Sequence, residues 1–346
     1  MLSNFTAHDL STCRRVAVKG GGFAMDDYWC WCGSVIAADG RYHMFASRWP
    51  KGLPFHPGWL TNSEIVRASA DRPEGPYTFE EVVLKPRGNA YWDGDSTHNP
   101  RVVKVGDRYV MYYMGSRHPF ATPRLGEPLT LQDPRVIVAR SNKRIGIATA
   151  TRITGPWQRL DKPVFEPVPD SYYSFFTSNP APVIAADGSV TLVFKCRRYL
   201  PSRTHSGMML GVAQAPRPEG PYTVITPEPI FGGPGQAELE DPFAWRSSRG
   251  IEMIAKDMSG KICGQSGGGI AAWSPDGKQW HIEESPGWLR DVQWSDGTSS
   301  RLGSAERPFV LFENGRPTHL FLAVADGPGG FEHASRTWVQ SFALQQ

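Results

Sequence analysis

The chain has 346 residues, with 37 Lys or Arg against 34 Asp or Glu and a formal net charge of +3. This balance, without a basic run interleaved with aromatic residues, argues against a nucleic-acid partner. Hydrophobic residues make up 40% of the chain and the mean hydropathy is −0.38, which is typical of a globular protein. No apolar run is long enough to span a membrane, so no membrane partner is expected.

Residues 1–9 lack the apolar segment of a signal peptide. We therefore expect a cytoplasmic protein, or a periplasmic or secreted one if a leader has been removed. The five cysteines form no CxxC pair and have no second Cys/His pair at zinc-ligand spacing, so we interpret them as small buried residues in a reducing compartment. Cys30 and Cys32 are two apart, which in a strand predicts the same face.

A short pattern returns five times along the chain. A polar or charged residue, usually followed by Pro, leads into a β-run, a turn and a second β-run. The copies span 33–40, 99–107, 179–188, 241–245 and 307–315. Self-similarity at this interval predicts a repeat architecture whose equivalent positions converge on one axis.

Each copy continues in the same way. The second runs (42–46, 109–114, 190–194, 251–255 and 318–323) are rich in aromatic and β-branched residues, and most follow a hairpin signal. Third runs follow at 144–150 and 210–215, and a fourth begins after Gly-Pro-aromatic turns such as Gly75-Pro76-Tyr77. Four strands per repeat predict an all-β, five-bladed β-propeller with four-stranded antiparallel blades, forming one domain over 1–346. We expect no helix, and we expect the run 337–344 to close a blade with N-terminal strands.

The residues just before each repeat should meet at one mouth of the central channel. They are Asp26, Asp27, Asp93, Asp95, His98, Asn99, Ser178, Asn179, Glu238, Glu240, Asp241, Glu306 and Arg307. Carboxylates from different blades at one end of a channel are what hydrolysis of a glycosidic bond requires. For any single residue, capping of its own turn is the alternative.

Basic and aromatic residues follow the same repeat. Basic residues end second runs, where they would bind an anionic substrate group, a phosphate nucleophile or the acidic cluster. They are Arg48, Arg117, Lys195, Arg197, Arg198 and Lys256. His98 is a candidate acid or hydrogen-bond donor to a sugar. Most aromatic residues should fill the wedge between blades, and the candidates for a sugar platform are Trp29, Trp31, Trp49, Tyr91 and Trp92.

The chain resembles the five-bladed propeller glycoside hydrolases, the broad group that contains families 43, 32, 62, 68 and 117. The resemblance covers nearly all of it. It is carried by the blade-entry motifs, the run 141–150, the Gly-Pro-aromatic turns and Glu240-Asp241-Pro242-Phe243. Cys32-Gly33-Ser34-Val35 and Ser47-Arg48-Trp49-Pro50 are most similar to the family 117 branch, which includes anhydro-galactosidases acting on algal galactans.

In these families a blade-one Asp is the base or nucleophile, a second Asp tunes the acid, and a later Glu is the acid. The resemblance implies Asp27 as base, with Asp26 as the alternate, and Asp95 as modulator. Blade three offers Ser178-Asn179-Pro180 where family 43 places its acid. The acid role then moves to Glu240, beside Asp241, with Glu306 or His98 as fallback.

We therefore expect an exo-acting, inverting glycosidase that acts on a plant or algal oligosaccharide. Its candidate catalytic residues are Asp27, Glu240, Asp95 and Asp241; its candidate substrate-binding residues are His98, Asn99, Arg48, Trp49, Trp92, Asn179, Arg197, Lys256, Glu306 and Arg307. No cofactor is expected to be required, although oxygen ligands in the channel leave a structural calcium ion open. A glycoside phosphorylase and a non-catalytic sugar-binding propeller remain as alternatives.

Overall fold

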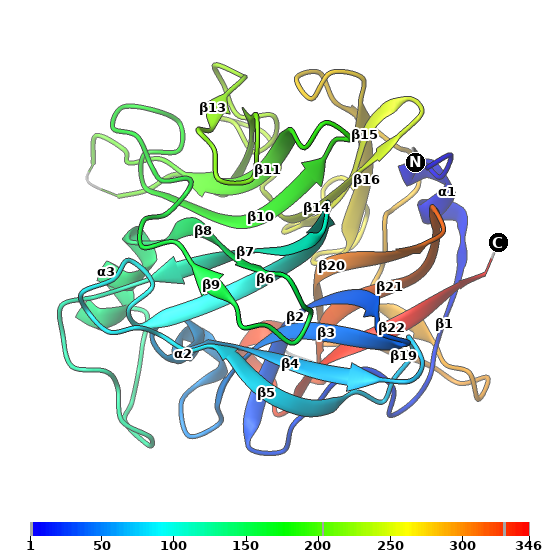
Figure 1. Ribbon diagram of the computed structural model, residues 1–346, viewed down its shortest axis with the longest axis horizontal. Coiled ribbons are helices and arrows are strands. Elements are labelled where there is room, and N and C mark those ends of the chain that lie inside the picture. Colours follow the sequence, from blue (N-terminus) through cyan, green and yellow to red (C-terminus); the bar gives the residue numbers. More distant parts are fainter. Residues whose placement is uncertain (1–2, 203, 328–329, 346) are drawn as a thin grey trace.

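Five four-stranded antiparallel sheets surround a central axis in the computed structural model, which describes residues 3–202, 204–327 and 330–345 (Figure 1). The prediction of an all-β, five-bladed propeller is confirmed. From the axis outward the first four blades contain β2 (Tyr28–Ala38), β3 (Arg41–Pro50), β4 (Glu64–Ala70) and β5 (Thr78–Leu84); β6 (Ser96–Val105), β7 (Arg108–Ser116), β8 (Arg144–Ala150) and β9 (Gln158–Arg159); β10 (Phe176–Ile184), β11 (Val190–Arg197), β12 (Met209–Ala215) and β13 (Thr223–Val224); and β14 (Leu239–Ser247), β15 (Gly250–Asp257), β16 (Gly269–Ser274) and β17 (His281–Ile282).

The fifth blade joins the two ends of the chain. Its inner strands are β20 (Ser304–Glu313), β21 (Arg316–Ala325) and β22 (Thr337–Gln345), and its outer strand is the N-terminal β1 (Arg14–Ala17), which pairs with β22. Figure 1 shows both termini on the same side of the ring. The expected closure is confirmed, and it protects the edge of β22 with a strand from the other end of the chain. A separate hairpin of β18 (Asp291–Gln293) and β19 (Ser299–Arg301) precedes this blade.

The prediction that the chain has no helix is wrong. Three short helices, α1 (Ala7–Thr12), α2 (Phe55–Asn62) and α3 (Pro134–Ser141), and a 3₁₀ turn, η1 (Gly330–His333), lie outside the blades. They are too short for helical periodicity to stand out, but cap signals were present. Thr6 and Asp9 form a capping box on α1, and Asp133 caps α3 ahead of Pro134. In the described part of the chain, no helix has the length and apolar character needed to cross a membrane.

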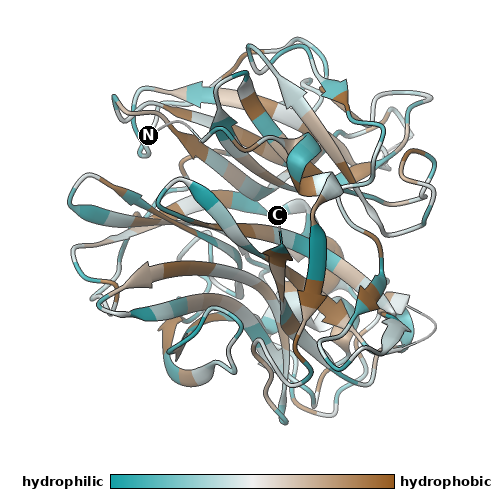
Figure 2. Cartoon of the chain, turned by 90° about the vertical axis from the view of Figure 1, so that its right-hand side faces the viewer, coloured by the Kyte–Doolittle hydropathy of each residue, from teal (hydrophilic) through white to brown (hydrophobic). Residues whose placement is uncertain are grey.

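The strands supply the apolar interior, as the brown segments of Figure 2 show, and hydrophobic clusters fill the wedges between neighbouring blades. Trp92 belongs to such a cluster rather than to the mouth of the channel, so its expected substrate-binding role is not supported. Its ring packs against Tyr113 and covers Gly115 and Gly146 of blade two. Both positions must be glycine because the indole fills the space of a side chain.

The packing of Trp92 predicts the effect of one added methyl group. A Cβ at position 146 would lie 2.2 Å from the Trp92 ring, so Gly146→Ala should lower the free energy of unfolding by about 1–3 kcal/mol. The matched control is Gly233→Ala, where the nearest atom is 3.6 Å away and the change should stay below about 0.5 kcal/mol. Urea unfolding measures both, and equal effects would contradict this packing.

Candidate active site

Each of the five innermost strands carries a β-bulge at an equivalent position. The register shifts after Trp31, His98, Ser178, Glu240 and Glu306. The next residue in each strand has a left-handed backbone, with φ between 49° and 60°, and these residues are Cys32, Asn99, Asn179, Asp241 and Arg307. A bulge redirects side chains away from the normal alternation of a strand. The repeat thus places two layers of side chains on the channel axis.

The lower layer is a hydrogen-bonded chain, which we call the axial ring. Cys32 donates to Asn99 Oδ1 (2.8 Å), Asn99 Nδ2 donates to Asn179 Oδ1 (2.7 Å), and Asn179 Nδ2 donates to Asp241 Oδ1 (2.5 Å). Arg307 completes the set through an ion pair with Asp241 at 2.6 Å. The cavity that remains within this layer is only about 10 Å³, so the ring seals the channel.

The upper layer forms the floor of a cavity of about 290 Å³ that we call the aromatic pocket. Four of the five residues that precede the axial ring line it, namely Trp31, His98, Glu240 and Glu306. Its other lining residues are Trp49, Phe55, His56, Trp59, Lys195, Met208, Lys256, Met258, Arg307, Phe331 and Glu332. Convergent charged groups below an aromatic wall are typical of a small-molecule site.

Two lysines hold the carboxylates at the floor of the pocket. Lys195 and Lys256 both bond Glu240, and Lys256 also bonds Glu306, which accepts a further hydrogen bond from Ser304. Burial alone would raise the pKa of Glu240, but the two ammonium groups and Arg307 hold it well below its usual range. Glu240 is therefore a carboxylate, which does not suit the proton-donating role expected of it.

Burial shifts other ionisable groups near the pocket. It raises the pKa of Asp241 to about 6, although Arg307 acts in the opposite direction. It lowers the pKa of His98 well below 6.5, assisted by Arg307, Lys143 and Lys195, so the imidazole is neutral. His98 Nδ1 lies 2.8 Å from Ser63 Oγ, and its ring stacks on Trp59. His98 is suited to hydrogen bonding rather than to acid catalysis.

The structure does not bring the expected base to the pocket. Asp27 is exposed and precedes β2, and its backbone oxygen accepts a hydrogen bond from Lys51. The blade-one equivalent of Asn99 is Cys32, which lies five residues later, or roughly 16 Å along an extended strand. Asp26 is exposed beside Asp27. Asp95 is buried outside the pocket lining, where it accepts from the backbone of His118 at 2.8 Å.

Two expected cations also lie elsewhere. Arg48 pairs with Glu64 at 2.8 Å and stacks on Tyr28, and Arg197 bonds His205 at 2.6 Å. The structure does bring Trp49, His98, Lys256, Glu306 and Arg307 to the pocket with Glu240, and it places Asn99, Asn179 and Asp241 in the axial ring.

The candidate aromatic platform divides in a similar way. Trp31 and Trp49 line the pocket, and Trp29 packs behind them on Phe55. Tyr91 is exposed beneath Arg87.

Several pocket residues were not among the predicted site residues. Phe55, His56 and Trp59 come from α2, and Phe331 and Glu332 come from η1. Their positions lie in loops without a repeat. Lys195 was among the basic residues expected at the ends of second runs but not among the candidate substrate-binding residues, although it occupies the same position as Lys256 one blade later.

A metal ion does not fit the acidic residues of the channel. One oxygen each from Glu240, Asp241 and Glu306 lies within 4.8 Å of the others. Lys195, Lys256 and Arg307 already bond these carboxylates, so a cation there would have to displace them. The possible calcium site thus remains a prediction that the donor set does not favour.

All five cysteines are free. Cys30 packs in the blade-one core and Cys32 lies in the axial ring, because the bulge separates two residues expected on one face.

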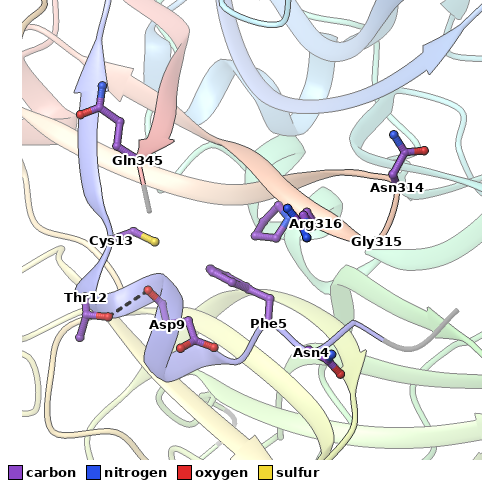
Figure 3. A pocket seen from close by; sticks show the side chains of 10 residues that line it. Asn4, Phe5, Asp9, Thr12, Cys13, Asn314, Gly315, Arg316 and Gln345 are labelled. Atoms are coloured by element: carbon purple, nitrogen blue, oxygen red, sulfur yellow. Dashed lines mark hydrogen bonds between the residues drawn. The ribbon is translucent and has the colours of Figure 1, made fainter.

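A second, larger cavity of about 690 Å³ lies beside the turn at Asn314 and Gly315, at the opposite end of β20 from Glu306 (Figure 3). Its acidic residue, Asp9, caps α1 by accepting from Thr6 at 2.8 Å. Among the described residues that line this cavity Asp9 is the only carboxylate, so they do not form a pair like that of the aromatic pocket.

Solved structures share this architecture. The chain is 14% identical to a family 117 glycoside hydrolase of the marine bacterium Zobellia galactanivorans, with a TM-score of 0.64 over 95% of this chain and 89% of that one. A family 62 α-L-arabinofuranosidase of Coprinopsis cinerea (12% identity, TM-score 0.62, 97% and 98% covered) is also similar. So is a family 43 enzyme of Xanthomonas citri complexed with xylotriose (13% identity, TM-score 0.58, 98% and 93% covered).

The fold is that of the five-bladed propeller glycoside hydrolases. These similarities confirm the fold predicted from the blade-entry motifs. No protein-family model and no curated protein matches the chain.

The lysine–carboxylate contacts predict a non-additive effect on stability. Glu240→Gln leaves the buried Lys195 ammonium without a carboxylate and should lower the free energy of unfolding by about 3–5 kcal/mol. In the double variant Lys195→Met/Glu240→Gln part of this loss should be regained, because the unpaired charge is gone. Urea unfolding of the wild type, of Lys195→Met and Glu240→Gln, and of the double variant gives the coupling energy. Additive losses would contradict the ion pair.

Asp241 predicts a pH dependence of stability. Its pKa is raised to about 6 in the folded state, so between about pH 4 and pH 6 the folded protein holds a proton that the unfolded chain has released. Stability from this group is greatest below that range and falls as the pH rises through it. Asp241→Asn should be less stable overall, because Arg307 loses its partner, but it should lack this fall. Thermal unfolding from pH 4 to 7 checks this; parallel profiles would contradict it.

Proposed function

We propose that the chain is an exo-acting glycoside hydrolase that cleaves a terminal sugar bound in the aromatic pocket. The observation that carries this proposal is the pocket itself, where two carboxylates from adjacent blades, Glu240 and Glu306, meet beneath Trp31, Trp49 and Trp59. Flat, CH-rich sugar faces stack on such rings. The fold shared with glycoside hydrolases supports the same class of reaction.

The shape of the site supports attack at a chain end. The axial ring closes the floor, and a volume of about 290 Å³ is at the lower end of the range for small-molecule sites. α2 and η1 supply part of the wall, where Phe55 and Phe331 pack with their ring centroids 4.6 Å apart. A pocket open on one side receives the end of an oligosaccharide and excludes its middle.

The two carboxylates differ in their lysine contacts, because Glu240 bonds two ammonium groups and Glu306 bonds one. Glu240 is the proposed nucleophile, and Glu306 in its protonated form is the proposed acid for the leaving oxygen. Glu306 then acts as base for the water that releases the sugar from Glu240. Their nearest oxygens lie within 4.8 Å, close to the separation of about 5–5.5 Å in retaining enzymes and below the 6.5–9.5 Å of inverting ones. We therefore propose retention of configuration, in place of the inversion expected with Asp27 as base.

A non-catalytic sugar-binding role is the second candidate. Both pocket carboxylates bond lysine ammonium groups, and a carboxylate neutralised in this way can serve hydrogen bonding alone. This alternative predicts sugar binding that survives substitution of Glu306 and no turnover by the wild type.

Substitutions of the two carboxylates should separate their roles. Glu306→Gln should lower kcat/KM for a natural linkage by about 10²–10⁴-fold yet spare kcat/KM for aryl glycosides with an activated leaving group, because forming the glycosyl-enzyme from them needs no acid. Lys195→Met/Glu240→Gln should lose both activities. The measurement is kcat/KM on plant and algal oligosaccharides and on matched aryl glycosides, with the anomer of the product read by NMR.

Glu228→Gln is the control, because Glu228 is exposed between β13 and β14, outside the pocket lining, and this substitution should leave both rates within about twofold. Full activity of the double variant would exclude Glu240 as nucleophile. Oligosaccharide binding without turnover in the wild type would favour the sugar-binding role.

A further inference from the structure

Lys143 is a buried lysine that the proposed reaction does not use. It directly precedes β8, its side chain is buried, and its backbone oxygen accepts a hydrogen bond from Thr177 of blade three. Among the described residues its ammonium group has no hydrogen bond and no carboxylate partner. It lies 3.5 Å from the centre of the Phe176 ring and 5.5 Å from that of Trp59. The attraction of aromatic faces is much smaller than the penalty of burying an ion, so an anionic partner would stabilise it.

Other cations surround Lys143. Arg140 on α3 has no ion pair among the described residues, and Arg197 at the end of β11 bonds only His205 there. Burial lowers the pKa of Lys143 well below 10.5, and Lys195, Arg140, Arg197 and Arg307 lower it further. Unlike Lys195 and Lys256, which bond Glu240, Lys143, Arg140 and Arg197 form no ion pair among the described residues, and only Arg197 has nearby carboxylates, those of Glu238 and Glu240. The side formed by blades two and three carries excess positive charge.

The cation-rich side adjoins the aromatic pocket. Trp59, beneath which Lys143 lies, lines the pocket and donates a hydrogen bond to His56 Nδ1 at 3.1 Å. His56 also lines the pocket, and Arg140, Lys143 and Lys195 contribute to holding its pKa at about 4, after burial. Lys143, Arg140 and Arg197 do not themselves line the pocket, so the acidic group of a bound sugar would reach them past His56 and Trp59.

We propose that Lys143, with Arg140 and Arg197 beside it, binds an oxyanion carried by the sugar, a carboxylate or a sulfate ester, so that the pocket selects an acidic sugar. This inference rests on the proposed function because it uses the same pocket. An ammonium in an apolar setting binds an oxyanion strongly, since the contact is charge-assisted and little screened.

The test compares acidic and neutral sugars that are otherwise matched. Binding of galacturonate against galactose, and of glucuronate against glucose, is measured by calorimetry and by the fluorescence of the tryptophans. The wild type should bind each acid at least about tenfold more tightly than its neutral counterpart. Lys143→Met should abolish that preference and leave neutral sugars within about twofold. Lys143→Met should also fold, because it replaces an unpartnered charge in an apolar site.

Lys104→Met is the matched control, since Lys104 is exposed on β6 with its ammonium 5.8 Å from the Tyr109 ring. It should keep the preference for acids. Equal affinity of the wild type for acidic and neutral sugars, or an unchanged preference in Lys143→Met, would overturn the proposal.

Turnover separates this inference from the proposed function. Hydrolysis of neutral aryl glycosides by wild type and Lys143→Met alike, with no acid preference, would leave the hydrolase and remove the oxyanion site. Binding of uronates that depends on Lys143, without any turnover, would support the oxyanion site and contradict the hydrolase. A third arm adds inorganic phosphate: turnover that requires phosphate and is lost in Lys143→Met would assign the oxyanion to a phosphate nucleophile and overturn the acidic sugar.

Discussion

The axial ring is the constraint on which the site depends. Hydrogen bonds run from Cys32 through Asn99 and Asn179 to Asp241, which also forms an ion pair with Arg307. The same bulge that turns each ring side chain into the channel turns the preceding side chain toward the mouth. Five left-handed residues cost free energy, and Cys and Arg adopt this backbone less readily than Asn or Asp. The ring bonds compensate, and in doing so they fix the floor of the pocket.

The charges above the ring follow from its closure. The axial ring closes the channel below Glu240 and Glu306, which are almost fully buried. Carboxylates buried to this extent would be protonated or expelled without partners. Lys195 and Lys256 prevent this, and they come from equivalent positions on the second strands of blades three and four. Equivalent positions of the repeat thus supply both the carboxylates and the ammonium groups above the ring. The ionised state of Glu240 is a property of the propeller, because three blades contribute to it.

Much of the fold could be predicted from the sequence because a similar sequence motif recurs in every blade. The pairs Asn99-Pro100, Asn179-Pro180, Asp241-Pro242 and Arg307-Pro308 each mark a bulge, and the hairpin signals mark the second strand. Blade one breaks the pattern with Cys32-Gly33. Asp27 was selected because it is the nearest acid before the blade-one motif. In the structure Asp27 lies before β2, which is eleven residues long, and Cys32 within β2 is the residue on the axis.

The parts of the site that could not be predicted lie outside the repeat. α2 is inserted between β3 and β4 and η1 between β21 and β22, and Phe55 stacks on Trp49 with an angle of 10° between the ring planes and contacts Phe331 at 4.6 Å. A pattern that recurs in each blade carries no information about segments that occur once. The division also has a chemical meaning: the repeat builds a floor of charged groups, while the insertions build the walls that select what reaches it. Lys143 and α3 belong to the second class, because α3 is itself an insertion, between β7 and β8. Selectivity for a sugar should therefore change through these insertions while the axial ring and the paired carboxylates stay in place.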